Sequence, residues 1–172
     1  MDSSSLSVVY ISKNAEKHLR ASLESVRAIA DEILLVDSGS TDNTVAIAES
    51  NAVRVLHQEW LGFGGQRQFA VDSARHDWIL MLDTDEILRS SAQPLIRSAI
   101  AQEQVVGFKL RRRNYIGRKP VRYSEWRNDW VLRLFNRRYG HYDPQAVVHE
   151  SWLCDGSVRP LSDIALDHYP FA

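Results

Sequence analysis

The first half of the chain alternates short apolar segments with segments of helical periodicity, and this alternation limits the possible folds more than any other feature. Strands are predicted at residues 6–12, 32–37, 53–56 and 78–82. Helices are predicted at residues 15–30, 44–50 and 65–74, with a further helix near 92–102 that Ser91 and Pro94 begin. This β-α-β-α order favours a mostly parallel sheet with helices on both faces.

The second half of the chain has a different pattern. Residues 105–115 and 130–136 are strand-like segments in which aromatic residues and arginines are interleaved, and a turn at 117–120 (GRKP) separates them. A chain of 172 residues can bury one core, and no low-complexity linker interrupts this one. We therefore expect a single α/β domain over residues 1–172, with a Rossmann-like, nucleotide-binding half at 1–104 and a mixed-sheet half at 105–172.

The segment WILMLDTDE at residues 78–86 places three carboxylates within four positions, directly after a buried strand. On an extended backbone Asp83 and Asp85 would share one face, and two carboxylates so close resist ionisation unless a cation lies between them. Mg²⁺ and Mn²⁺ prefer oxygen ligands, so the segment predicts a divalent metal site. The alternative is a solvated acidic turn that caps the next helix.

A second polar loop, DSGSTDNT at residues 37–44, follows another predicted strand. Its small side chains let backbone amides approach a ligand, and Ser40, Thr41 or Asp42 can cap the next helix, just as Asn14 can cap the first. Asp37 is placed to accept hydrogen bonds from a ribose or a base. A plain capped turn is the alternative, but two polar loops at one edge of a parallel sheet predict a ligand cleft.

The glycine-rich segment LGFGGQRQ at residues 61–68 lacks the lysine and Ser/Thr of a P-loop and the spacing of a dinucleotide-binding turn. We interpret it as a flexible loop that delivers Arg67, at the start of a helix, toward phosphate groups. A surface ion pair is the alternative for Arg67.

Charge is strongly segregated along the chain. The segment 109–138 contains eleven Lys/Arg residues against Glu125 and Asp129, a local balance of +9, whereas the remaining residues have a balance of −10. This asymmetry predicts an anionic partner near the basic segment. The alternative is that Arg111, Arg112 and Arg113 lie on both faces of a strand and only keep it soluble.

Two acidic residues of the second half are candidates for a general base. Glu150 follows the strand-like run 146–148 and lies beside His149, so it is the first candidate, and Asp129 is the second. The single cysteine, Cys154, forms no internal disulfide, and no signal peptide or apolar run of membrane-spanning length is recognisable. These features predict a cytoplasmic protein, with no nucleic-acid partner expected.

Several segments, taken in order, resemble family-two glycosyltransferases of the GT-A fold. They are SVVYISKNAEKHL from residue 7, ADEILLVDSGSTDNT, GFGGQRQFA, DWILMLDTDE, WVLRLFNR from residue 130 and VHE from residue 148. The similarity is greatest to the bacterial lipopolysaccharide-core β-1,4-glucosyltransferases that act on inner-core heptose, and it extends from about residue 6 to 169. Such relatives usually continue past the His168-Tyr169 pair, so we expect the acceptor half to be short at its carboxyl end.

The resemblance implies an inverting transfer of a sugar, with UDP-glucose as the expected donor, to an anionic glycolipid such as lipopolysaccharide inner-core heptose. It further implies peripheral contact with the cytoplasmic face of the inner membrane. Asp37 would contact the uridine, Asp83 the ribose and Asp85 the metal (Mg²⁺ or Mn²⁺), with His168 as a second metal contact. The expected donor-binding residues are Ser12, Asn14, Glu16, Asp37, Ser38, Gly39, Ser40, Arg67, Asp83 and Thr84. The expected acceptor-binding residues are Arg111, Arg113, Trp126 and Arg133.

Two other functions fit parts of the sequence. DTDEI at residues 83–87 is similar to the nucleophile motif of haloacid-dehalogenase phosphatases, although Ile87 departs from that motif and its later lysine and paired aspartates have no counterpart here. A non-catalytic module that binds a nucleotide sugar is the second alternative. Phosphate release from p-nitrophenyl phosphate would favour the first, and UDP binding without turnover the second.

Overall fold

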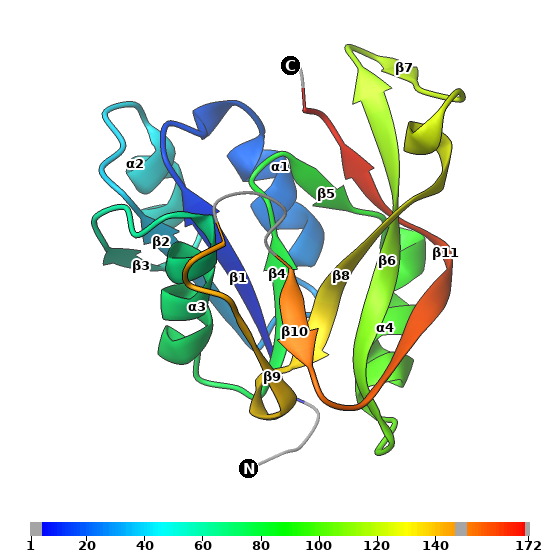
Figure 1. The fold of residues 1–172 in the computed structure, drawn as a ribbon. Helices are drawn as coiled ribbons and strands as arrows, with labels where there is room; N and C mark the ends of the chain where they lie inside the picture. Colours follow the sequence, from blue (N-terminus) through cyan, green and yellow to red (C-terminus); the bar gives the residue numbers. More distant parts are fainter. Residues whose placement is uncertain (1–4, 147–150, 171–172) are drawn as a thin grey trace.

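The computed structural model describes residues 5–146 and 151–170, and one long curled sheet forms its centre (Figure 1). The first half contributes four parallel strands in the order β3-β2-β1-β4. Their bounds are β1 (Leu6–Ser12), β2 (Glu32–Asp37), β3 (Arg54–His57) and β4 (Trp78–Leu82). The parallel arrangement confirms the sheet predicted for the first half, because all four strands end at the same edge.

The second half extends this sheet with strands of both directions. β8 (Asp129–Asn136) pairs antiparallel with β4 and with β6 (Val105–Ile116). β6 pairs parallel with β11 (Ser157–His168), which pairs antiparallel with β5 (Glu86–Leu88). β7 (Lys119–Pro120) lies against the end of β6, and β9 (Gly140–Tyr142) with β10 (Trp152–Cys154) forms a separate two-stranded sheet. The mixed character expected for the second half is confirmed.

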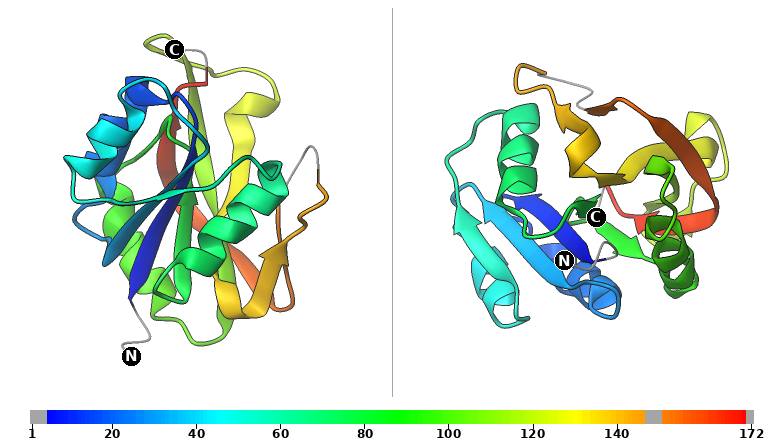
Figure 2. Two further views of the ribbon diagram at one scale, coloured as in Figure 1. Left: turned by 90° about the vertical axis from the view of Figure 1, so that its left-hand side faces the viewer. Right: turned by 90° about the horizontal axis from the view of Figure 1, so that it is seen from below.

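Helices cover both faces of the sheet, as the two turned views show (Figure 2). α1 (Glu16–Val26), α2 (Thr44–Glu49) and α4 (Gln93–Ile100) pack on one face, whereas α3 (Phe63–Ser73) and the β9–β10 pair pack on the other. The described residues also form three short 3₁₀ turns: η1 (Ser90–Ala92), η2 (Glu125–Asn128) and η3 (Arg137–Tyr139). Within the described residues no helix is long and apolar enough to cross a bilayer.

Two helix starts differ from those predicted. Asn14 has a positive φ of 50° and does not cap α1, which begins at Glu16; its side-chain oxygen accepts the Thr41 amide instead. The helix also ends at Val26, well before residue 30. Gly64 and Gly65 lie in the first turn of α3, so this segment is not the flexible loop predicted.

A β-bulge in β8 directs one arginine out of the regular alternation of the strand. Phe108 of β6 pairs with Leu134, but the next residue, Lys109, pairs with Leu132. Arg133 is therefore the extra residue of the bulge. Bulges often redirect a side chain beside a functional site, and here the bulge turns Arg133 toward the loop that follows β4.

Gly64 allows α3 to pack closely against the segment that follows β9. A Cβ atom at this position would lie 1.8 Å from the backbone carbonyl oxygen of Asp143, whereas one at Gly65 would lie 3.0 Å from the Leu61 side chain. Close contact of this kind with backbone cannot be relieved by a side-chain rotation.

We predict that Gly64→Ala lowers the free energy of unfolding by about 1–3 kcal/mol, because the overpacking outweighs the helix preference of alanine. Gly65→Ala is the matched control, with a much smaller loss because Leu61 can shift. Denaturant unfolding of both variants measures the difference. Equal stabilities of the two variants would contradict the close packing described here.

Candidate functional site

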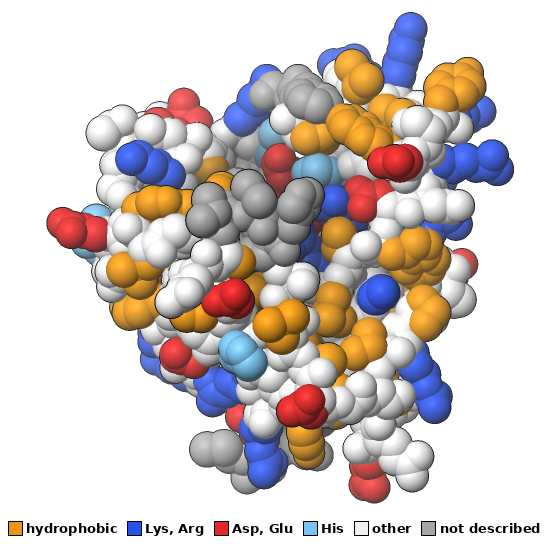
Figure 3. All heavy atoms as spheres, viewed as in Figure 1, with side chains coloured by type: hydrophobic (Ala, Val, Ile, Leu, Met, Phe, Trp, Pro, Cys, Tyr) orange, Lys and Arg blue, Asp and Glu red, His pale blue; other side chains and the backbone are white. Residues whose placement is uncertain are grey.

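A cavity of about 550 Å³ opens at the carboxyl ends of β1 and β4. Figure 3 shows charged and histidine side chains gathered in a hollow near the centre of the face seen in Figure 1. Six of the predicted donor or metal residues line the cavity: Ser12, Ser38, Arg67, Asp83, Thr84 and Asp85. Ile11, Lys13, Trp60 and Phe63, which the sequence patterns did not single out, complete its wall. The two polar loops therefore do meet at one edge of the sheet.

Both oxygens of the Asp37 carboxylate accept hydrogen bonds from neighbouring residues. Its Oδ1 accepts hydrogen bonds from the hydroxyls of Ser12 and Ser40 (2.8 and 2.5 Å), and its Oδ2 accepts the backbone amides of Gly39 and Ser40 (3.0 and 2.8 Å). Burial disfavours the charged form, but these hydrogen bonds outweigh it and lower the pKa of Asp37 below its usual value. Asp37 thus fixes the shape of the loop, with Gly39 at a φ of +107°.

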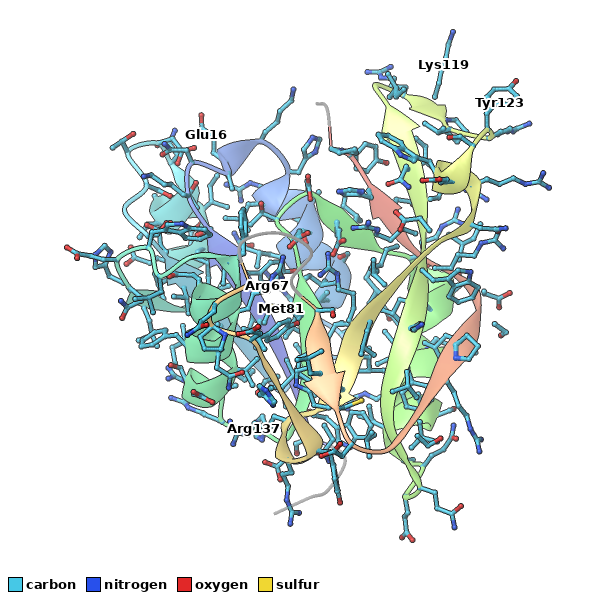
Figure 4. All side chains as sticks on the ribbon, in the orientation of Figure 1. Glu16, Arg67, Met81, Lys119, Tyr123 and Arg137 are labelled. Carbon is cyan, nitrogen blue, oxygen red and sulfur yellow. The ribbon has the colours of Figure 1, made fainter. Side chains whose placement is uncertain are left out.

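Asn14 and Glu16 connect the start of α1 to the loop before α2. The Thr41 amide donates to Asn14 Oδ1 (2.8 Å), and the Asn43 amide donates to Glu16 Oε2 (2.9 Å). Asp42 accepts the Thr44 amide at 2.9 Å, so of the three predicted caps Asp42 contacts the first turn of α2. Asn14 and Glu16 are not among the residues that line the 550 Å³ cavity, and Glu16 projects from the surface in Figure 4.

Asp83 forms ion pairs with two arginines from different elements. Arg67 NH2 donates to Asp83 Oδ1 at 2.7 Å, and Arg133 NH2 donates to Oδ2 at 2.8 Å. Burial alone would raise the pKa of Asp83, but Arg133 and Arg67 outweigh it and hold this pKa well below its usual range. Figure 4 shows Arg67 reaching from α3 toward the strand that carries Met81.

The backbone after β4 differs from the extended conformation that was expected for Asp83 and Asp85. β4 ends at Leu82, and the next residues form a tight turn in which the Glu86 amide donates to the Asp83 carbonyl (3.0 Å). The backbone is therefore not extended here, and two guanidinium groups balance the charge of Asp83. Arg67 forms a buried ion pair in the cavity wall, not a surface ion pair.

The ion pairs continue from Asp83 into the second half of the chain. Arg133 NH2 also donates to Glu86 Oε1, which accepts Arg112 NH1 as well, both at 2.9 Å. Glu86 is completely buried, so its charge requires such partners. Arg112 then donates from Nε to Asp129 Oδ2 at 2.8 Å. A buried network thus connects the loop after β4 with the first residue of β8.

The network ends at a histidine whose orientation is fixed. Asn114 Nδ2 donates to Asp129 Oδ2 (2.9 Å), so its Oδ1 is the atom that faces His168 Nδ1 at 2.6 Å. Because an amide oxygen only accepts, Nδ1 of His168 carries a proton. His168 Nε2 then points toward Asp85 Oδ1, 3.5 Å away. The sequence placed Asp85 and His168 in one metal site, and the structure brings these two residues together.

Asp85 and His168 form a donor set that suits a divalent cation bound together with a substrate. A carboxylate and a neutral imidazole nitrogen, whose other nitrogen donates a hydrogen bond, are ordinary ligands of Mn²⁺. Over the described parts of the chain, no group of three or more His, Cys, Asp or Glu side chains could hold a metal. Two protein ligands fit a cation that takes its other ligands from phosphate oxygens and water.

The predicted acceptor residues are divided between two environments. Arg133 pairs with Asp83 and Glu86 in the network, which indicates an internal role, and its acceptor contact stays a prediction. Arg111, Arg113 and Trp126 instead line a second cavity of about 440 Å³. The first candidate base, Glu150, lies outside the described residues, and the second, Asp129, is part of the network.

Sequence reasoning did not assign Glu86, Arg112 or Asn114 to the site. The alternation of side chains along β6 could have predicted a separate role for two of them. Arg112 and Asn114 lie on one face of the strand, and Arg111 and Arg113 lie on the other. Arg112 was instead considered together with its two neighbours as part of one basic block. Glu86 was counted among the acidic residues after β4 but received no role of its own.

The chain is similar in sequence to known glycosyltransferases. The profile described as "Glycosyl transferase family 2" matches residues 7–162. Lipopolysaccharide core biosynthesis glycosyltransferase LpsC of Rhizobium meliloti (strain 1021) is 35% identical over 95% of this chain and 63% of LpsC. An uncharacterized glycosyltransferase of Rickettsia felis is 33% identical over 85% of this chain and 53% of its own length. The chain thus spans less than two thirds of these relatives.

Solved structures confirm the expected α/β fold of the GT-A type. S. aureus TarS 1–349 in complex with UDP matches with a TM-score of 0.72 at 18% identity, over 96% of this chain and 60% of that one. Mycobacterium tuberculosis glucosyl-3-phosphoglycerate synthase, in complex with Mn²⁺, UDP and glucosyl-3-phosphoglycerate, matches with a TM-score of 0.54 at 23% identity. That match covers 66% of this chain and 45% of the synthase.

The family match excludes one of the alternatives that the sequence left open. A haloacid-dehalogenase-like phosphatase is wrong as an interpretation of residues 83–87, because the profile includes this segment within a continuous match from residue 7 to 162. Since that match spans most of the chain, and LpsC is 35% identical along nearly all of it, the chain belongs to glycosyl transferase family 2.

Proposed function

We propose that this glycosyltransferase domain moves a sugar from a UDP-sugar to a hydroxyl group of an anionic glycan, with inversion at the anomeric carbon and with a divalent cation. The observation that carries the proposal is the Asp85–His168 pair, in which Asp85 lines the cavity and His168 is oriented by Asn114. The cavity at the ends of β1 and β4 and the position of Asp85 in its wall, with His168 at the end of β11 beside it, support the same proposal.

The donor is proposed to be a UDP-sugar, and UDP-glucose is the first candidate. UDP is the nucleotide bound in the TarS complex and in the synthase complex. In this chain Ser12, Ser38 and Thr84 offer hydroxyl groups along the cavity, while Lys13 and Arg67 supply positive charge. Trp60 and Phe63 form an edge-to-face pair at the wall, with ring centroids 4.8 Å apart, and offer an aromatic surface to the base or sugar.

Asp85 and His168 are the residues proposed to hold Mg²⁺ or Mn²⁺. A bound cation supplies Lewis-acid chemistry, offsetting the negative charge that develops on the leaving diphosphate. The chain itself contributes the orientation of the two ligands: Asn114 holds the His168 ring, and the Tyr169 amide donates to the Asp85 carbonyl at 3.1 Å. Ordered ligands of this kind lose little freedom when the site is filled.

A carboxylate of the second half is proposed to act as general base. It takes the proton of the acceptor hydroxyl as that oxygen forms a bond to the anomeric carbon and the bond to the diphosphate breaks. Glu150 remains the first candidate from the sequence. Asp129 is the second, but its Oδ2 already accepts Arg112 and Asn114, which favours a structural role within the network.

The acceptor is proposed to be an anionic saccharide such as the inner core of lipopolysaccharide. This proposal is supported by the similarity to LpsC, a lipopolysaccharide core biosynthesis glycosyltransferase, and by the basic segment 109–138. Peripheral contact with the cytoplasmic face of the inner membrane would bring the domain to a lipid-linked acceptor. A module that binds nucleotide sugars without turnover, the alternative that the sequence left open, is the second candidate.

We predict that UDP binds at least roughly tenfold more tightly with Mn²⁺ than with EDTA, and that Asp85→Ala removes this difference. The physical reason is the loss of the one carboxylate that faces His168 Nε2. Calorimetric titration of UDP, with Mn²⁺ or with EDTA, measures both affinities. Asp72→Ala, at an exposed position of α3, is the control and should keep the metal dependence. Equal UDP affinity of the unchanged chain with Mn²⁺ and EDTA would refute the metal site.

We predict that Glu150→Gln keeps UDP-sugar binding but slows transfer to an inner-core lipopolysaccharide acceptor by about 10²–10⁴-fold, the usual effect of removing a positioned base. Asp129→Asn is the matched control. Single-turnover transfer measures both rates, and UDP titration confirms that both variants still bind the nucleotide. A normal rate for Glu150→Gln together with an inactive Asp129→Asn would reverse the two roles. Full activity of both variants would refute the base assignment.

A further inference from the structure

Three of the nine arginines of the basic segment differ from the others in their partners. Arg112, Arg133 and Arg137 form ion pairs with acidic side chains. In contrast, no acidic side chain of the described residues forms an ion pair with any member of a second group, which we call the open arginines: Arg111, Arg113, Arg122 and Arg127. These four arginines therefore carry positive charge that no ion pair within the described residues balances.

The open arginines surround one cavity. Its volume is about 440 Å³, and it lies between β6, the end of β7 with the two residues that follow it, η2 and one residue of β11. All four open arginines line it, together with Arg112, Pro120, Val121, Trp126 and Ile164. Its lining thus combines five arginines with apolar and aromatic surface and contains no carboxylate. Arginines converging on a cavity repel one another unless an anion binds between them.

Three acidic side chains near the cavity either bond to other residues or do not line the cavity. Asp167, on the strand beside Arg113, accepts the Tyr115 hydroxyl (3.2 Å) and pairs with Arg89 (3.4 Å). Asp129 is occupied by Arg112 and Asn114. Glu125 of η2 is exposed and does not line the cavity. Among the described residues, these acidic side chains therefore do not balance the positive charge of the open arginines.

Arg111, one of the open arginines, is held in place by two hydrogen bonds, and its Nε–H group is still without an acceptor in the described structure. Arg111 NH2 donates to the Arg127 carbonyl (3.3 Å) and to Asn128 Oδ1 (3.1 Å), which fixes the guanidinium against η2. Its Nε is buried and has no hydrogen-bond partner in the described structure. A buried N–H without a partner is costly, and an oxyanion in the cavity would provide the missing acceptor.

We propose that this arginine cavity binds a phosphate group of the acceptor saccharide. Guanidinium groups match phosphate oxygens with paired N–H donors, and the apolar wall of Trp126, Val121 and Ile164 offers surface for a sugar ring. Arg112 lines this cavity and also bonds Glu86 and Asp129, so the phosphate site adjoins the network that borders the donor cavity. The assignment rests on the proposed transfer to an anionic glycan. It names the part of the protein that would contact the phosphate group of that acceptor.

The test titrates the full chain with glucose 6-phosphate, with glucose, and with UDP plus Mn²⁺. We expect Arg113→Gln and Arg122→Gln each to weaken glucose 6-phosphate binding roughly tenfold and to leave UDP binding unchanged. Arg113→Lys should lose part of the affinity, because it keeps the charge but not the paired donors. Arg159→Gln, an exposed arginine of β11 outside the basic segment, is the control and should bind glucose 6-phosphate normally.

Three results would overturn the proposal. The first is equal glucose 6-phosphate affinity in the unchanged chain and in Arg113→Gln and Arg122→Gln. The second is equal binding of glucose and glucose 6-phosphate. The third is retention on phosphatidylglycerol vesicles without any binding of glucose 6-phosphate, which would assign the arginines to a lipid surface. UDP binding in the same titration separates the two proposals: its loss with intact glucose 6-phosphate binding refutes the donor site and leaves the phosphate site standing.

Discussion

The ion pairs of Asp83 with Arg67 and Arg133 are the interaction on which the rest of the site depends. They join α3 and the loop after β4 to the bulge of β8, in which Arg133 lies 50 residues after Asp83. Glu86, Arg112 and Asp129 continue the same network into β6. Removing one partner from such a buried set typically costs about 3–5 kcal/mol, because the charge that remains has no compensation. The network therefore fixes the relative position of the parallel half and the mixed half of the sheet at the wall of the donor cavity.

This arrangement gives the two aspartates after β4 separate tasks. Asp83 is held by arginines within the structure, whereas Asp85 faces His168, whose ring is oriented through Asn114 and Asp129. One continuous set of contacts thus links the residues proposed for the cation to a strand that also borders the arginine cavity. The donor site and the acceptor site would then be supported by the same few side chains, which accounts for the burial of Glu86 and Asn114.

Much of the fold could be predicted from local patterns. The apolar runs of β1, β2 and β4 end at polar loops, and that pattern was sufficient to predict a parallel sheet and the edge at which the cavity lies. The partners of the charged side chains could not be predicted, because they depend on which strands become neighbours. The bulge at Arg133 and the turn after Leu82 are properties of tertiary packing, and both change the direction of a charged side chain. Asp83 was thus expected beside a cation, and Arg133 was expected at the acceptor.

A crystal structure of the chain with UDP and Mn²⁺, with the ion identified by its anomalous scattering, tests the central claim most directly. The account predicts one Mn²⁺ ion coordinated by Asp85, His168 Nε2 and diphosphate oxygens, while Asp83 keeps its ion pairs with Arg67 and Arg133. An ion bound between Asp83 and Asp85, with those arginines displaced from Asp83, would contradict it.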